Sequence, residues 1–283
     1  MNKLHIEKNT VQETLIIPLY GRKMCSERFP ELYQDELAKE LCQRLDYDFS
    51  SLEKKKASFF YEFGALEAAM RQLDIMWELK AYLKQHPKAT IVNLGCGLDQ
   101  TGKTCDNGQC RIVNIDFPKI IEVRNCLIPL SENERNIAMD LKDERWMDEI
   151  DGSQGVFFFA AGVFHYFQKE EVKTLLHKMS LKFPGGVLVF DTVGKKGLKL
   201  MLSKTLKNMG IKDVGGYFYV ENLKEIQWFS TTEVSSKGYM LGYYDMKVPS
   251  IGFLHRFLAK IGDDIFKMAI IKMQFKKGSS STY

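Results

Sequence analysis

The chain has 283 residues, 45% of them hydrophobic and 27% charged, which is long enough and apolar enough to bury one large core. Its 40 Lys and Arg are spread among 36 Asp and Glu, and a net charge of +4 is too small an asymmetry to indicate a nucleic-acid partner. The N-terminal region lacks a signal-peptide pattern, and no uncharged apolar run approaches the ~20 residues of a membrane span. We therefore expect a cytoplasmic protein without a membrane partner.

The first 85 residues predict a helical cap. They show no alternation of strand and helix patterns, and two helices are expected, at 31–44 and 58–83. In the second, apolar residues from Phe59 to Trp77 recur at helical spacing and form a stripe that needs a partner surface. We expect the cap (1–85) and the remainder (86–283) to form one domain, because the length favours one enlarged domain over two.

From residue 89 onward, short β-branched and aromatic runs alternate with helical patterns, which is typical of a mostly parallel sheet with helices on both faces. The fourth run is apolar throughout, so we expect it at the centre of the sheet. The last two runs flank a helical insert at 253–261 and lack a full crossover helix, which predicts an antiparallel pair at the sheet edge. The seven predicted strands of this doubly wound α/β fold are 90–94, 111–116, 136–139, 155–160, 187–191, 238–246 and 268–275.

A Gly-x-Gly turn follows the first predicted strand. Such a turn lets the backbone approach a ligand closely, and ligands of open α/β sheets bind beyond the carboxyl ends of the strands. Nineteen residues after Gly97, Asp116 ends the second strand, where a carboxylate can accept both hydroxyl hydrogens of an adenosine ribose. We assign to the cofactor site the residues at these strand ends: Asn93, Gly95, Cys96, Gly97, Asp116, Phe117, Ala160 and Ala161.

The glycine spacing bears on which nucleoside binds. A dinucleotide fingerprint places its third glycine three residues after the second, where it seats a pyrophosphate on a helix N-terminus, and here that position is Gln100. A cofactor without a pyrophosphate therefore fits better. At the end of the third strand, Asp140 and Leu141 offer a carboxylate and an apolar side chain to an adenine ring. Alternatively, Asp140 caps the helix that begins near Lys142.

Four segments carry a resemblance to a known family: 93–99 (NLGCGLD), 116–121 (DFPKII), 145–147 (RWM) and 162–167 (GVFHYF). In this order and spacing they resemble the leucine carboxyl methyltransferase-like family, and within it the tetracenomycin-type polyketide O-methyltransferases, over residues 14–228. The resemblance implies a class I methyltransferase that uses S-adenosylmethionine. Arg71 would then meet the carboxylate of the methionine moiety, and Gly95 would lie under the cofactor. Asp116 would hold the ribose, and Asp140 with Leu141 the adenine.

Two positions depart from the family pattern. The family often carries an acid before the Gly-Val of the 162–167 segment, where it contacts the methionine part, and this chain has Ala161. The family also tends to have Thr-Arg after Gly-Leu-Asp, where this chain has Gln100 and Thr101. The departures indicate that the cofactor's amino group is held differently, that cofactor affinity is weaker, or that activity is lost.

Three residues are candidates for the acceptor side of the site. Arg22 precedes the predicted cap helices, in a segment that resembles the family's N-terminal cover over the active site, and it can bind an acceptor carboxylate bidentately; a surface arginine is the alternative. His165 and Tyr166 follow the central strand. For a phenol or alcohol acceptor, His165 serves as general base. An ionised carboxylate needs only alignment of oxygen, methyl carbon and sulfur, and His165 then lines the pocket.

Three functions remain open. The first is S-adenosylmethionine-dependent methyl transfer to a carboxylate or hydroxyl of a small molecule, of the polyketide or metabolite type. The second is an NAD(P)-dependent oxidoreductase, which shares the glycine turn and Asp116 but is disfavoured by Gln100. The third is a non-catalytic S-adenosylmethionine-binding relative, which Ala161 suggests. We expect no metal, since the six cysteines lack zinc-ribbon spacing, although the turn between Cys105 and Cys110 can bring their thiols together.

Overall fold

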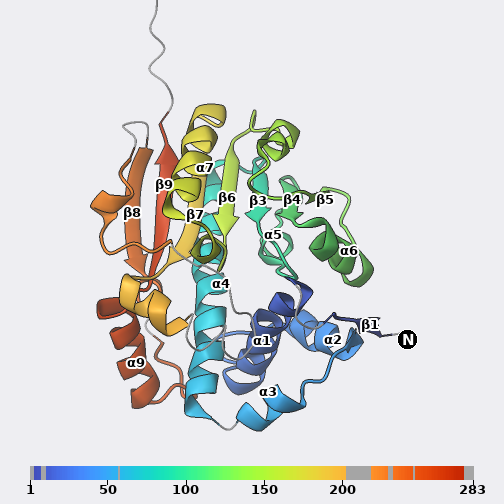
Figure 1. The fold of residues 1–283 in the computed structure, drawn as a ribbon, viewed down its shortest axis with the longest axis vertical. Helices are drawn as coiled ribbons and strands as arrows, with labels where there is room; N and C mark the ends of the chain where they lie inside the picture. The colour runs from blue at the N-terminus through green and yellow to red at the C-terminus, as the bar shows by residue number, and fades with distance from the viewer. Residues whose placement is uncertain are drawn as a thin grey trace, which may run out of the picture.

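The structure, a computed structural model, describes residues 3–7, 11–56, 58–201, 218–228, 232–244 and 246–276. Its centre is a seven-stranded sheet in the order β5-β4-β3-β6-β7-β9-β8 (Figure 1). Five neighbouring strands are parallel, while β9 runs antiparallel to β7 and β8 antiparallel to β9. The strands are β3 (Thr90–Leu94), β4 (Arg111–Asp116), β5 (Glu134–Ala138), β6 (Val156–Ala160), β7 (Val187–Thr192), β8 (Thr232–Gly238) and β9 (Ala269–Phe275). The predicted doubly wound, mostly parallel fold with an antiparallel edge pair is confirmed.

The strand β6 occupies the middle of the sheet, as its apolar composition predicts. All five of its residues are buried, and their side chains alternate between two cores. Phe157 and Phe159 belong to the core that α4 (Phe59–Gln85) covers, whereas Phe158 belongs to the core that α7 (Lys169–Lys182) covers. Because side chains point to alternate faces along a strand, a wholly apolar strand requires cover on both faces, and the two helices supply it (Figure 1).

The remaining helices flank the sheet or build a cap at one end of it. The cap contains α1 (Ile16–Arg28), α2 (Glu36–Arg44) and α3 (Ser50–Lys55), and β2 (Leu45–Asp46), directly after α2, pairs with β1 (Leu4–His5). Farther along are α5 (Thr101–Thr104), α6 (Pro118–Leu127) and α9 (Phe253–Asp264), and residues 195–201 are also helical. Short 3₁₀ helices occupy Val11–Leu15, Glu144–Glu149, Phe164–Tyr166 and Leu223–Glu225. Within the described residues, no helix combines the length and apolar character that crossing a bilayer requires.

The long helix α4 joins the cap to the sheet. Near its start it packs closely on α1, where a Cβ added to Gly21 would lie 3.6 Å from the Cβ of Ala68. Its second half lies on the sheet, and Leu79 and Leu83 share a core with Ile91 of β3. In Figure 1 the carboxyl ends of β3 and β6 point toward the cap. The cap therefore covers the end of the sheet at which ligands of parallel sheets bind.

Two predicted elements are shifted. The helix expected at 31–44 begins only at Glu36, because the Asp35 carboxylate caps it by accepting a hydrogen bond of 2.8 Å from the backbone N–H of Ala38. The strand expected at 136–139 is β5, which starts two residues earlier. In the cap, α1 is a helix that the sequence pattern did not single out, and Arg22 lies within it rather than before the cap helices.

The strand predicted at 238–246 is wrong. The edge strand β8 ends at Gly238, and the chain then turns, with the backbone N–H of Gly242 donating to the oxygen of Gly238 at 2.9 Å. Within this turn, the backbone N–H groups of Met240 and Leu241 donate to the carboxylate of Asp263, at 2.8 and 2.9 Å, and not to a neighbouring strand. The sequence of β8, TEVSSKG, is polar because an edge strand is partly solvated, and the apolar run after it misled the prediction.

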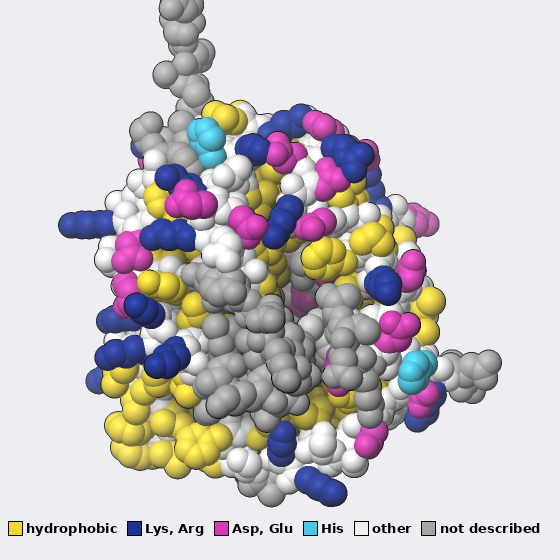
Figure 2. Space-filling model, viewed as in Figure 1, with side chains coloured by type: hydrophobic (Ala, Val, Ile, Leu, Met, Phe, Trp, Pro, Cys, Tyr) yellow, Lys and Arg dark blue, Asp and Glu magenta, His cyan; other side chains and the backbone are white. Residues whose placement is uncertain are grey.

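The amphipathic helix α9 presents apolar side chains to solvent. Its inner face buries His255, Ala259 and Gly262, whereas Phe253 on its outer face is 77% exposed and stacks on the half-exposed ring of Phe257. The resulting apolar area is visible over α9 at the lower left of Figure 2. The inner face contributes to the stability of the fold through burial, and the outer face does not.

Candidate active site

The glycine turn after β3 has the backbone geometry that the sequence predicts. Gly95 and Gly97 have φ angles of +67° and +47°, in the left-handed region that favours glycine. A Cβ on Gly95 would come within 2.6 Å of the side chain of Val163, so any other residue would be strained here and would displace Val163. The N–H groups of Gly95 and Cys96 both donate to the oxygen of Ile115, at 2.9 and 3.0 Å, which ties the turn to β4. The backbone is therefore bare and fixed where a ligand would lie.

Asp116, the last residue of β4, is locked against this turn. Its Oδ2 accepts a hydrogen bond of 2.7 Å from the N–H of Gly97, and its Oδ1 accepts one of 2.8 Å from Phe117, whose ring is 44% exposed beside it. Burial raises the pKa of Asp116 above its usual value, although the two backbone donors oppose that shift. A carboxylate fixed beside a bare glycine turn is suited to accept hydrogen bonds from the two hydroxyls of a ribose.

Asn93 braces the loop after the turn. The side chain of Asn93 is buried and donates to Oδ2 of Asp99 at 3.0 Å, and Gln72 of α4 donates to the other carboxylate oxygen at 2.8 Å. Cys96 lies in the same loop with a buried thiol, and burial raises the pKa of that thiol. From α6, the buried guanidinium of Arg124 donates to the backbone oxygens of Gly97 and Asp99 at 3.0 and 2.7 Å. These contacts give Asn93 and Arg124 a supporting role for the turn.

Arg22 ties the cap to the glycine turn. It is only 8% exposed, and its Nε donates to Oδ2 of Asp35 at 3.0 Å while its Nη2 donates to the oxygen of Leu98 at 3.1 Å. A third group, Oδ1 of Asp99, lies 3.8 Å from Nη1. Arg22 is thus a buried, paired cation between α1 and the loop, not the surface arginine that was the alternative.

Asp140 and Leu141 lie just past the end of β5, the neighbour of β4. The Oδ1 atom of Asp140 accepts a hydrogen bond of 2.9 Å from the N–H of Lys142 and so forms a turn, whereas the 3₁₀ helix that follows begins at Glu144 and is capped by Asp143, not by Asp140. The side chain of Leu141 is buried, and its backbone oxygen accepts a bond of 3.1 Å from the indole of Trp146. An adenine contact for either residue stays a prediction.

A second cluster lies at the ends of β6 and β7, centred on Asp191. Its Oδ1 accepts a hydrogen bond of 2.6 Å from the N–H of Gly162, and its Oδ2 lies 3.2 Å from Nη1 of Arg71 and 3.3 Å from Nε2 of His165. Burial would raise the pKa of Asp191, but the positive charge of Arg71 and the bond from His165 hold it well below its usual range. The pKa of Arg71 is raised in turn by that carboxylate. The structure therefore brings Arg71 and His165, 94 residues apart in the sequence, onto one carboxylate.

The other predicted residues surround this cluster. Ala160 ends β6 and is buried, Ala161 is half-buried beside it, and the Tyr166 ring is 45% exposed.

The sequence analysis missed Asp191 and Arg124 as site residues. Asp191 carries the same signal as Asp116, a carboxylate at the end of an apolar strand, whereas nothing in the sequence marks Arg124.

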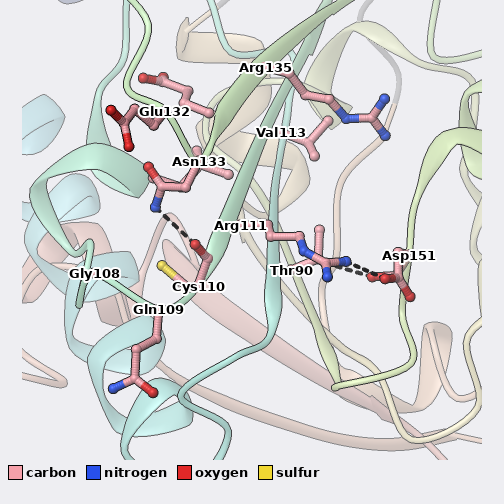
Figure 3. Close-up of a pocket in the computed structure, with 12 residues that line it drawn as sticks. Thr90, Gly108, Gln109, Cys110, Arg111, Val113, Glu132, Asn133, Arg135 and Asp151 are labelled. Atoms are coloured by element: carbon pink, nitrogen blue, oxygen red, sulfur yellow. Dashed lines mark hydrogen bonds and ion pairs between the residues drawn. The ribbon is translucent and has the colours of Figure 1, made fainter.

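A cavity of about 540 Å³ lies at the opposite end of the sheet (Figure 3). Its lining includes the first residues of three strands, Thr90, Arg111 and Glu134, so it opens at the amino ends of β3, β4 and β5. Arg111 pairs there with Asp151. Ligands of open α/β sheets bind at the carboxyl ends, and this cavity is therefore separate from the predicted site.

The thiols near this cavity are free. Cys110 donates to Oδ1 of Asp106 at 3.3 Å, and neither it nor Cys105 forms a disulfide. Among the residues that the structure describes, no three His, Cys, Asp or Glu side chains are placed to hold a metal ion.

The residues at the strand ends fit a nucleoside that carries an amino-acid arm. The glycine turn presents backbone without side chains, Asp116 offers a ribose acceptor, and Arg71 offers a cation to a carboxylate. The clusters adjoin each other, because Val163 touches the glycine turn and follows Gly162 directly. S-adenosylmethionine is such a nucleoside, with an adenine, a ribose and a methionine moiety. These three moieties would then lie in that order from β5 toward β7.

The family comparison agrees with this geometry. Residues 17–180, more than half of the chain, match the family described as leucine carboxyl methyltransferase. A curated relative from Streptomyces glaucescens, the tetracenomycin polyketide synthesis O-methyltransferase TcmP, is 28% identical over 184 residues. That match covers 65% of this chain and 66% of the relative, slightly less than two thirds of its length.

Solved structures share the fold. A methyltransferase structure from Thermobifida fusca, described there as putative, superposes with a TM-score of 0.58 over 96% of this chain and 100% of that one, at 15% identity. A DUF574 family protein from Streptomyces avermitilis gives 0.51 over 91% and 97%, at 12% identity. These likenesses support the fold alone, whereas the sequence match identifies the lineage. The chain belongs to the leucine carboxyl methyltransferase family of S-adenosylmethionine-dependent methyltransferases.

Proposed function

We propose that this protein transfers the methyl group of S-adenosylmethionine to an oxygen of a small-molecule acceptor. The observation that carries the proposal is the bond between Asp116 and Gly97, which fixes a carboxylate beside a bare glycine turn at adjoining strand ends. Family membership and the name of the Streptomyces relative, an O-methyltransferase, support the same reaction.

The cofactor residues are assigned from their positions along the sheet. We assign the ribose to Asp116 and the adenine to Asp140 and Leu141, with Gly95 lying under the cofactor. Arg71 would bind the carboxylate of the methionine moiety, with Ala160 and Ala161 forming the wall beside it. Asn93, Cys96, Gly97 and Phe117 complete the cofactor side by shaping the turn and its lip.

When bound, the cofactor supplies an electrophilic methyl group on a sulfonium. The protein's part is to exclude water and hold the acceptor oxygen in line with that group. Tyr166, whose ring is partly exposed next to the Arg71 cluster, would contact the acceptor. His165 would accept the proton of a hydroxyl acceptor, and an acceptor carboxylate would need no base.

The alternative functions are weaker. A nicotinamide dinucleotide requires a helix N-terminus behind the glycine turn to hold its pyrophosphate, and here that helix, α5, has four residues. Loss of activity through Ala161 would require the methionine arm to lack charged partners, and under our assignment Arg71 would still be one. We further propose a reducing, cytoplasmic setting, which the six free cysteines support.

Calorimetric titration tests the proposal. We expect the protein to bind S-adenosylmethionine and S-adenosylhomocysteine, and Asp116→Ala to weaken both at least about 10-fold, as loss of hydrogen bonds to a charged acceptor does. Reduced nicotinamide nucleotides, followed by fluorescence, should not bind. Binding of those nucleotides by a folded protein that ignores S-adenosylhomocysteine would overturn the assignment. Acceptor screening with labelled methyl donor then separates carboxylates from phenols and alcohols.

A further inference from the structure

Asp191 is a buried carboxylate for which the proposed reaction has no step. It is 3% exposed and is the second-last residue of β7. Three donors from separate segments converge on it: Arg71 of α4, Gly162 after β6, and His165 of the 3₁₀ helix Phe164–Tyr166. Burying a charge is costly unless it is paired, so the site is built to keep this carboxylate ionised. Its pairing determines where the guanidinium of Arg71 lies.

The contact uses one nitrogen of Arg71. Within the described part of the chain, Arg71 makes its bond to Asp191 through Nη1, which leaves Nε and Nη2 to other partners. Its guanidinium lies against the backbone of Gly162, where a Cβ would come within 2.7 Å of Nη1. A side chain at position 162 would displace the guanidinium, and the φ of +72° at Gly162 also favours glycine.

The cluster is continuous with the glycine turn. Gly162 is followed by Val163, whose methyl group closes the space above Gly95. The register of the sheet pairs Ala160 with Phe190, so the next residues, Ala161 and Asp191, stand at neighbouring strand ends. Ala161 carries no charge, whereas the side chain of Asp191 provides a negative charge at the adjacent strand end.

We propose that Asp191 is a positioning residue for the amino-acid end of S-adenosylmethionine: it orients Arg71 toward the methionine carboxylate and provides the negative charge that the α-ammonium group requires. This inference rests on the proposed function. A zwitterion presents opposite charges to an ion pair that is already arranged, so binding needs little reordering of side chains. Asp191 acts through Arg71 and through its field, and it takes no part in methyl transfer.

Two ligands separate this role from a structural one. S-adenosylhomocysteine carries the amino-acid arm, whereas 5′-methylthioadenosine has the same thioether nucleoside without it. We expect Asp191→Asn to weaken S-adenosylhomocysteine binding about 10-fold or more and to change methylthioadenosine binding less than about twofold. Arg71→Gln should show the same selectivity. If Asp191 acts through Arg71, the double variant should lose little more than either single variant, because their effects are coupled.

The controls distinguish the possible failures. Asp263→Asn, at a half-buried carboxylate that holds the turn after β8, should leave both affinities unchanged if circular dichroism shows that the variant is folded. Equal weakening of both ligands by Asp191→Asn would show a structural role and overturn the inference. Unchanged binding of both would overturn it as well. Wild-type protein that binds neither ligand would instead refute the proposed function.

Discussion

Arg22 and Leu98 are joined by a hydrogen bond of 3.1 Å, from Nη2 of the arginine to the backbone oxygen of a residue 76 positions away. Because Arg22 is also paired with the half-buried Asp35, its removal would leave that carboxylate without its cation and the Leu98 oxygen without this donor. We expect Arg22→Ala to lower the free energy of unfolding by about 3 kcal/mol. S-adenosylhomocysteine binding should weaken too, since the glycine turn loses its tie to α1. Urea denaturation and calorimetry measure the two effects.

Arg28→Ala is the matched control on the same helix. Arg28 is 65% exposed and pairs with Glu62 at 3.0 Å, so its loss should cost less than about 1 kcal/mol. If Arg22→Ala instead left unfolding and cofactor binding unchanged and raised only the KM of the acceptor, the tie would be refuted. The acceptor-binding role predicted from the sequence would then be supported.

Asp140 offers a test of where the adenine lies. S-inosylhomocysteine has an oxygen in place of the exocyclic amine of adenine, so a carboxylate that accepts a bond from the amine should discriminate against it. We expect the wild-type protein to prefer S-adenosylhomocysteine by about 10-fold, and Asp140→Ala to remove most of that preference. Competition calorimetry gives the ratio. An unchanged preference in the variant would restrict Asp140 to its bond with the N–H of Lys142.

Asp74 makes stability depend on pH. It is fully buried on α4, neither oxygen has a hydrogen-bond partner in the described part of the chain, and burial raises its pKa to about 9. Native protein keeps this proton while the unfolded chain, with the ordinary pKa of 3.8, releases it. The free energy of unfolding therefore falls as pH rises from about 4 to about 9. Asp74→Asn should be more stable than wild type by at least about 1 kcal/mol at pH 8, and the difference should shrink toward pH 4.

The control for Asp74 is Asp263, a half-buried carboxylate that has hydrogen-bond donors. Asp263 accepts two backbone hydrogen bonds, so an amide in its place would turn a donor toward donors. We expect Asp263→Asn to be less stable than wild type near neutral pH, by thermal or chemical denaturation. The interpretation of Asp74 fails if Asp74→Asn is also less stable at pH 8.

His165 should report the chemistry of the acceptor. Its Nε2 lies 3.3 Å from Asp191, and its Nδ1 is buried without a hydrogen-bond partner in the described chain. If the acceptor is a hydroxyl, His165→Asn should lower kcat by about 10²- to 10⁴-fold. If the acceptor is a carboxylate, kcat should change less than about 10-fold. Steady-state kinetics across pH with both acceptor classes decides between these outcomes.

The sheet could be predicted because its strands carry their environment in their sequence. A run such as 155–160, apolar at every position, fits only a strand covered on both faces, and β6 occupies that place. The edge strand β8 could not be found in the same way, since TEVSSKG lacks an apolar pattern and its partner β9 alone determines it. The helix α1 was not predicted because its sequence contains Pro18 and Gly21, and both residues are poor helix formers.

The site residues could be predicted where the position of a strand end in the sequence identifies the residue. Gly95, Gly97 and Asp116 meet because adjacent parallel strands end together, which a spacing can reveal. The cluster of Arg71, His165 and Asp191 joins three distant segments, and only packing brings them together. Arg71 was assigned from the family resemblance, but its ion pair with Asp191 depends on the angle at which α4 crosses the sheet.

The way α4 packs on both α1 and the sheet restricts insertions in this helix. Arg71 lies near the middle of α4, between the half that packs on α1 and the half that packs on the sheet. An α-helix advances about 1.5 Å and turns about 100° for each residue, so one insertion between Gly64 and Arg71 would rotate the first half of α4 away from its partner. Proteins that keep both packing contacts of α4 must therefore also keep its number of residues.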